Sequence, residues 1–170
     1  GVDKFYEENN TIKPFSNSNN IKAPINQYKE QLLLGKILPI GICFNKKLLY
    51  QHVDFDGYFN MKITIEDYPI LVDLAMNTNI YKVNEVLHVY RIHHDSYSNK
   101  KTFESHAFLN LQMKNLFDFF NKKYEFPKDI IQKFNNNYYK QLLFLAGYFE
   151  KKEVGKKAFN KIKTKSIKDY

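Results

Sequence analysis

The sequence contains one cysteine, Cys43, among 170 residues. A single thiol excludes an intramolecular disulfide and a metal site built from several cysteines, and it suits a reducing compartment. Because Cys43 stands in an apolar stretch, we expect it to be a small buried hydrophobic residue.

Long hydrophobic runs are also missing. Hydrophobic residues make up 44 % of the chain, yet no run approaches the roughly 20 residues that a membrane-spanning helix requires. Residues 1–10 are polar and acidic, so no secretory signal peptide is expected there. These features predict a soluble, cytoplasmic protein with a real hydrophobic core, with peripheral contact at the inner face of a membrane as the alternative.

Negative charge is scarce relative to positive charge. The 26 Lys and Arg residues exceed the 18 Asp and Glu residues and give a net charge of +8, which fits polyanionic or anionic-membrane partners. However, Lys, Asn, Ile, Tyr and Phe are all abundant together, as AT-rich codon usage produces, so basicity alone indicates no ligand. The chain has no internal repeat, and no zinc-finger or RNA-binding motif supports a nucleic-acid partner.

The first part of the chain predicts three kinds of local structure. Residues 1–24 are polar and Asn-rich, and predict an extended, poorly ordered arm. Residues 25–34 predict a short helix that ends at Gly35. The apolar run at 40–44 predicts a buried strand, after which Asn45 is expected to cap a second short helix.

The central part predicts one helix and two strands. Residues 55–59 have the composition of a turn. Residues 66–77 predict a helix whose acidic residues lie in the first turn, where the helix dipole favours them. The β-prone segments 79–83 and 86–91, joined by a tight link, predict a hairpin or two neighbouring strands.

The remainder of the chain predicts helices only. Apolar residues recur every three to four positions in 103–124, 127–150 and 152–165. Residues 99–170 are therefore expected to form a helical C-terminal extension of three helices.

The acidic pair Glu66 and Asp67 opens the most informative stretch. Adjacent residues of a helix point about 100° apart, so both carboxylates cannot aim at one atom. One can face a substrate while the other caps the helix or holds a cation. The plainer interpretation is that both are only favourable charges at a helix N-terminus.

A basic, hydroxyl-rich turn closes the same stretch. His93 and His94 are adjacent and face opposite sides of an extended segment, so the plainer interpretation is two solvated loop histidines. A helix that returns through a strand would bring the imidazoles near the carboxylates. A carboxylate base beside an imidazole metal ligand is one interpretation of such a site.

Residues 37–98 resemble the C-terminal half of the catalytic domain of family 2 glycosyltransferases. A small, apolar segment and a basic stretch come first, at 41–49, and a loose match to an F-D turn follows at 53–59. The E-D-x-x-L motif corresponds to 66–70, with Ile in place of Leu. The motif Y-R-x-H-x-x-S-x-S is present in full at 90–98. Four pieces in this order and spacing are more specific than any one of them.

The resemblance implies an α/β fragment, predominantly helical, that carries part of a GT-A sheet. Residues 25–98 would be the acceptor-side half of the catalytic domain, between the arm at 1–24 and the helical extension at 99–170. The family's nucleotide-binding half and its D-x-D motif should precede residue 37, and the polar start of this chain does not supply them. We therefore expect the fragment to be inactive alone, with an unpaired sheet edge that invites a homodimer.

The resemblance also implies residue roles. Asp67 matches the catalytic base of an inverting transferase, with Glu66 as its supporting neighbour. Arg91, His93 and Ser96 match the side that meets the substrate diphosphate, and His93 is also the candidate metal ligand. The donor would be a nucleotide-diphospho-sugar and the acceptor a glycan or polyprenyl-linked molecule of bacterial surface-polysaccharide synthesis. Mg²⁺ or Mn²⁺ would act in the intact enzyme, and none is expected in the fragment.

A different class of function stays open on the residues alone. The helical patterns of 102–165 carry excess apolar surface on 103–124 and a lysine-rich end. A helical module without catalysis, which docks a partner protein or a membrane, is the alternative that these patterns support.

Overall fold

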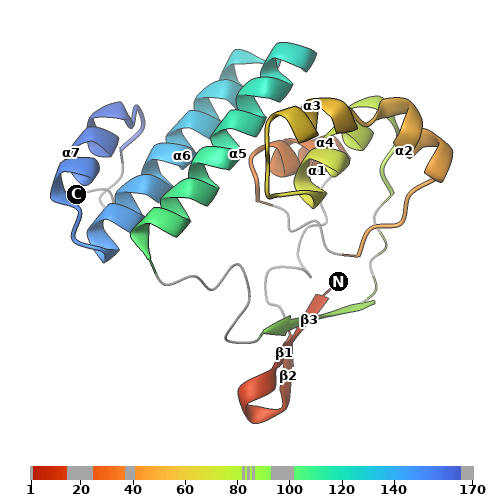
Figure 1. Ribbon diagram of the computed structural model, residues 1–170, viewed down its shortest axis with the longest axis horizontal. Coiled ribbons are helices and arrows are strands. Elements are labelled where there is room, and N and C mark those ends of the chain that lie inside the picture. Colours follow the sequence, from red (N-terminus) through yellow and green to blue (C-terminus); the bar gives the residue numbers. More distant parts are fainter. Residues whose placement is uncertain are drawn as a thin grey trace. The chain divides into compact units, whose positions relative to one another are not determined.

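The computed structural model describes residues 2–14, 25–36, 41–81, 83, 85, 87–92 and 102–165. The chain divides into two compact units, Gly1–Asn99 and Lys100–Tyr170, which are coloured red to green and green to blue in Figure 1. This division falls one residue after the boundary between 98 and 99 that the sequence predicts.

Helices form most of the described chain, and three strands form a small mixed sheet. The prediction of a predominantly helical α/β chain is therefore confirmed at this level. Its assignment to a GT-A sheet remains a prediction.

The sheet belongs to the first unit and has the strand order β2-β1-β3. Strand β1 (Val2–Tyr6) runs antiparallel to β2 (Thr11–Pro14) and parallel to β3 (His88–Ile92). A 3-10 turn, η1 (Glu7–Asn9), joins β1 to β2, and Asn10 completes the reversal in the left-handed region at φ 52°. The start of the chain thus pairs with a strand that lies beyond four helices in the sequence (Figure 1).

Two predictions about strands are wrong here. The poorly ordered arm expected over 1–24 is, over residues 2–14, a β-hairpin, and its remainder lies outside the described residues. The hairpin expected from 79–83 and 86–91 is also wrong, because 79–81 and 83 form no strand and β3 pairs with β1. A two-residue hydrophobic period fixes which face of a strand is apolar, but it does not specify the partner strand.

The buried strand predicted at 40–44 is wrong over 41–44, while residue 40 lies outside the described residues. Gly41 has φ 70°, which interrupts an extended backbone. A Cβ atom at Gly41 would lie 2.1 Å from Cε1 of His88, so the segment turns where the chain meets this imidazole. Cys43 is exposed rather than buried, because an apolar run becomes a strand core only where a sheet receives it.

Two short helices have the predicted caps. Helix α1 (Ile25–Leu33) ends at Gly35, whose φ of 66° lets its N–H reach Leu32 O and lets the following N–H, from Lys36, reach Gln31 O, both at 2.9 Å. Helix α2 (Lys46–His52) begins at Asn45, whose side chain accepts a hydrogen bond from the N–H of Lys47 at 2.9 Å.

The turn predicted at 55–59 is instead a helix, α3 (Phe55–Asn60). Asp54 caps it, because its Oδ1 accepts a hydrogen bond from the N–H of Gly57 at 2.9 Å. Asp and Gly are typical turn residues, but with a capping carboxylate in front of them the turn continues into a helix.

Helix α4 (Asp67–Asn77) is the core of the first unit and matches the helix predicted at 66–77. It packs against α1 and α2. Val72 is fully buried, and Leu71, Leu74 and Ala75 are at most 6 % exposed. Burial of such side chains contributes about 1.5–3 kcal/mol each for the larger ones.

The second unit consists of the three predicted helices, α5 (Phe103–Tyr124), α6 (Lys128–Tyr148) and α7 (Lys152–Lys161). Helix α6 packs against both others, and α5 and α6 lie side by side in Figure 1. Phe117 and Phe134 stack with ring centroids 3.8 Å apart, and Leu116 and Phe120 beside them are fully buried.

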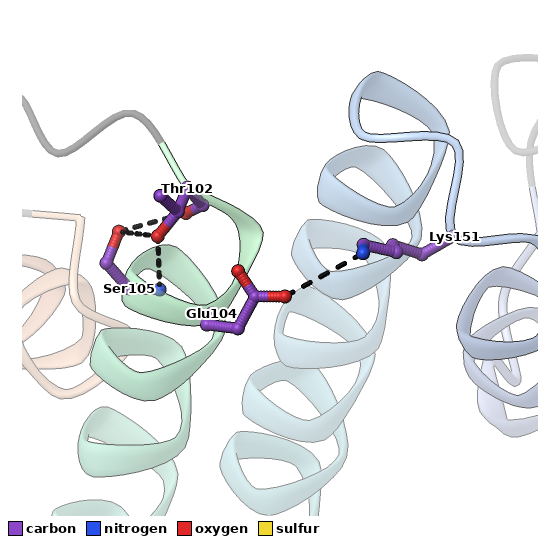
Figure 2. Close-up of polar contacts among 4 residues, drawn as sticks. All are labelled: Thr102, Glu104, Ser105 and Lys151. Carbon is purple, nitrogen blue, oxygen red and sulfur yellow. Dashed lines mark hydrogen bonds and ion pairs between the residues drawn. The ribbon is translucent and has the colours of Figure 1, made fainter.

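Polar contacts fix the start of α5. Figure 2 shows the Oγ1 of Thr102 accepting a hydrogen bond from the N–H of Ser105 at 3.2 Å, which caps the helix. It also shows the ion pair of Glu104 with Lys151, which lies in the link between α6 and α7. The carboxylate oxygen and the ammonium nitrogen are 3.7 Å apart. The ammonium also lies 5.7 Å from the centre of the Phe103 ring, so one lysine contacts two side chains of the first turn.

Among the described helices, none is both long enough and apolar enough to cross a bilayer.

Candidate functional site

The carboxyl group of Asp67 lies at the exposed N-terminus of α4. Its Oδ1 accepts a hydrogen bond from the backbone N–H of Tyr68 at 2.8 Å. Glu66 occupies the N-cap position and is also exposed, and its side chain caps no backbone N–H. The two predicted acids therefore lie together at the positive end of the helix dipole, and both are open to solvent.

Buried residues that follow Asp67 fix the backbone that carries it. Tyr68 and Pro69 are buried directly after it. The hydroxyl of Tyr68 donates a hydrogen bond to Leu33 O at 3.0 Å, which ties the first turn of α4 to the end of α1. An exposed carboxylate on a fixed turn keeps its position when a substrate arrives, as a general base must.

Burial of the Tyr68 phenol raises its pKa well above the usual 10.0. The unfolded chain loses this proton near pH 10 whereas the folded chain keeps it, so the contribution of Tyr68 to stability is complete below pH 10 and is lost as the pH rises above it. We expect the free energy of unfolding to fall by up to about 1.4 kcal/mol per pH unit there. Tyr68→Phe should remove this part of the slope in urea unfolding measured across alkaline pH.

The matched control for Tyr68→Phe is Tyr81→Phe, since Tyr81 is 89 % exposed. It should leave the alkaline slope unchanged. Equal slopes in the two variants would show that burial of Tyr68 does not control alkaline stability.

A second carboxyl group, which the sequence did not single out, lies behind the first on α4. Asp73 is fully buried, and its Oδ2 accepts hydrogen bonds from the N–H of Asp54 at 2.9 Å and from the hydroxyl of Tyr58. It thereby joins α4 to the beginning of α3. The signal in the sequence is a single acid inside the apolar segment 70–75, where a buried charge or acceptor needs donors from elsewhere.

Arg91 lies in β3 and its side chain is 65 % exposed. Its Nε donates a hydrogen bond to Oε2 of Glu7 at 3.3 Å, and its Nη2 contacts Oε1 of the same carboxylate. These hydrogen bonds, and next the negative charge of Glu7, raise the pKa of Arg91. The guanidinium therefore holds a carboxylate bidentately, as its geometry favours, and this carboxylate belongs to the turn after β1.

His93 and Ser96 lie outside the described residues, as does His94. The structure therefore brings Glu66 and Asp67 together, pairs Arg91 with Glu7, and leaves the approach of His93 to Asp67 as a prediction. In the described part of the chain, no three side chains of His, Cys, Asp or Glu gather into a group that could hold a metal ion. The predicted metal role of His93 thus stays a prediction as well.

Comparisons with protein-family models, with curated proteins and with solved structures found no match to this chain. The chemistry assigned to the site rests on its motifs and its geometry. An exposed, anchored carboxylate can accept a proton, and an exposed guanidinium can bind an oxyanion if its present partner gives way.

Proposed function

We propose that this chain is the acceptor-side portion of an inverting family 2 glycosyltransferase in which Asp67 is the catalytic base. The observation that carries the proposal is the exposed Asp67 carboxylate on the first turn of a mostly buried helix. Asp67 lies 23 residues before Tyr90, where the Y-R-x-H-x-x-S-x-S motif begins. An acid that only favours a helix N-terminus would need no such partner motif.

In the proposed reaction the acceptor hydroxyl attacks the anomeric carbon of a nucleotide-diphospho-sugar from the face opposite the diphosphate. The new C–O bond forms as the bond to the diphosphate breaks, and the hydroxyl proton passes to Asp67. The configuration at the anomeric carbon inverts. Mg²⁺ or Mn²⁺ in the intact enzyme would neutralise charge on the departing diphosphate.

The other residues take supporting roles in this proposal. Glu66, at the N-cap position beside Asp67, is its supporting neighbour. Arg91, which pairs with Glu7 beside the β1–β3 pairing, would act with His93 and Ser96 on the side that meets the diphosphate. The acceptor would be a glycan or a polyprenyl-linked molecule, and the intact enzyme would work in the cytoplasm at the inner face of a membrane.

The test is the stereochemistry of transfer by the intact protein that contains this chain. It is incubated with a panel of nucleotide-diphospho-sugars and glycan or polyprenyl-phosphate acceptors, and the product is analysed by NMR. We expect the anomeric configuration of the product to be opposite to that of the donor, and no transfer by residues 1–170 alone. A product with retained configuration would contradict the proposal.

The alternative is a helical interaction module without catalysis. It is favoured by apolar side chains exposed one turn apart on α6, since Phe144 is 70 % and Tyr148 is 74 % exposed. The same assay separates the two functions, because a module without catalysis gives no transfer with any donor.

A further inference from the structure

A cavity of about 470 Å³ lies on the second unit, lined by α5, the first half of α6 and the end of α7. Four of its lining residues are lysines, one from α5, one from α6 and two from the end of α7 and the residues just after it: Lys114, Lys128, Lys161 and Lys163. The lining includes no carboxylate. The volume falls within the range of roughly 300–1,000 Å³ that is typical of small-molecule sites.

The positive charge of this cavity is only partly neutralised by the protein. Lys114 lies 2.6 Å from Oδ1 of Asp118, its neighbour on α5. Among the described residues, Lys128, Lys161 and Lys163 have no ion-pair partner. Ammonium groups that line one concave surface raise the local positive potential, and a bound anion relieves their mutual repulsion.

The segment that carries Lys163 is held in place over α6. Asn136 accepts hydrogen bonds through Oδ1 from the N–H of Lys163 at 2.9 Å and from the N–H of Thr164 at 3.3 Å. Its Nδ2 donates to Thr164 O at 3.4 Å. One α6 side chain thus fixes the backbone after α7, so Lys163 lines the cavity from a constrained segment of chain.

The remaining lining supplies neutral donors. Gln132, Asn135 and Tyr139, whose side chains carry amide and hydroxyl groups, also line the cavity, as does the apolar Ile131. Phosphate oxygens accept hydrogen bonds from ammonium, amide and hydroxyl groups, and charge-assisted bonds are the strongest of these. We infer that this cavity binds a phosphate-bearing anion with two or more negative charges, independently of the function proposed for the first unit.

The test uses pyrophosphate as the probe and the whole chain as the protein. Binding is followed by isothermal titration calorimetry at low and at high salt. The groove variant combines Lys128→Gln, Lys161→Gln and Lys163→Gln, three exposed positions whose replacement leaves the core intact. We expect it to weaken pyrophosphate binding about tenfold or more, and we expect binding by the unmodified chain to weaken as salt rises.

The matched control combines Lys122→Gln, Lys152→Gln and Lys157→Gln, which remove the same charge from exposed positions outside the cavity lining. It should keep most of the affinity. Equal losses in the two triple variants would show that net charge alone attracts the anion and would overturn the inference, as would the absence of binding by the unmodified chain at low salt.

A second experiment, with lipid vesicles, identifies whether the bound phosphate group belongs to a lipid or to a soluble molecule. Vesicles of phosphatidylcholine with and without phosphatidylglycerol are co-sedimented with the chain and with both triple variants. If the chain binds the anionic vesicles, if only the groove variant loses this binding, and if pyrophosphate competes with it, the cavity binds a lipid headgroup. Pyrophosphate binding that the groove variant loses while vesicle binding is unchanged assigns it to a soluble phosphorylated molecule.

Discussion

Asp67→Asn is expected to lower sugar transfer by the intact enzyme about 10²–10⁴-fold, the usual contribution of a general base. The amide has nearly the shape of the carboxylate, and its oxygen can still accept the hydrogen bond from the N–H of Tyr68. Helix α4 should therefore start as before, and the Michaelis constant for the donor should change little. The measurement is kcat and KM for donor and acceptor in the intact protein, with unfolding by urea as the check on stability.

Glu66→Gln is the matched control for this substitution. It removes the same charge from the adjacent exposed position, but Glu66 points about 100° away on a helix and caps nothing. We expect it to lower kcat far less than Asp67→Asn, by its electrostatic support alone. Unchanged turnover in Asp67→Asn would remove this residue from the mechanism. Equal losses of kcat in both variants would indicate that the two negative charges act together electrostatically and that Asp67 is not the base.

The helices were the part of the fold that the sequence could predict, because their signals are local. Apolar residues at three- and four-residue spacing located α4, α5, α6 and α7, and Asn45 marked a start. Each of these signals acts between residues fewer than five positions apart, so neither the fold of the unit nor its partner elements are needed to read it.

The sheet could not be predicted in the same way. Strand β3 was expected next to the segment 79–83, which is the nearest β-prone sequence, and it pairs instead with β1 at the start of the chain. The polar composition of residues 2–14 concealed a hairpin, since a small sheet with exposed faces needs few apolar side chains. Strand pairing is a contact between distant residues, and one sequence does not encode its register in a local pattern.

The same difference between local signals and contacts of distant residues applies to the candidate site. Glu66 and Asp67 were located by their place before an apolar run, and the structure puts them there. The pairing of Arg91 with Glu7 could not be predicted, because 84 residues separate the partners. Asp73 was missed for a related reason, since its donors, Asp54 and Tyr58, belong to a segment that the sequence predicted as a turn.

Asp73→Ala is expected to lower the free energy of unfolding of the first unit by about 2–5 kcal/mol. The substitution removes the acceptor for the N–H of Asp54 and for the hydroxyl of Tyr58, and a buried donor left without its acceptor costs about 1–3 kcal/mol. The hydroxyl of Tyr58 keeps a longer contact with Pro69 O at 3.4 Å. It also leaves a small cavity in the fully buried side of α4. Urea unfolding followed by circular dichroism measures the loss.

Three further variants separate the contribution of the hydrogen bonds to stability from that of the charge and from the nonspecific effect of a substitution. Both bonds reach the same oxygen, Oδ2, so Asp73→Asn can keep one acceptor oxygen in that place and should cost less than Asp73→Ala. Tyr58→Phe removes the hydroxyl that donates to Asp73 and that also lies 3.4 Å from Pro69 O, and it should cost about 1 kcal/mol. Asp56→Ala replaces an exposed acid of α3 and should change stability by less than about 0.5 kcal/mol. A loss in Asp73→Ala no larger than in Asp56→Ala would contradict the proposed role of Asp73 in joining α4 to the beginning of α3.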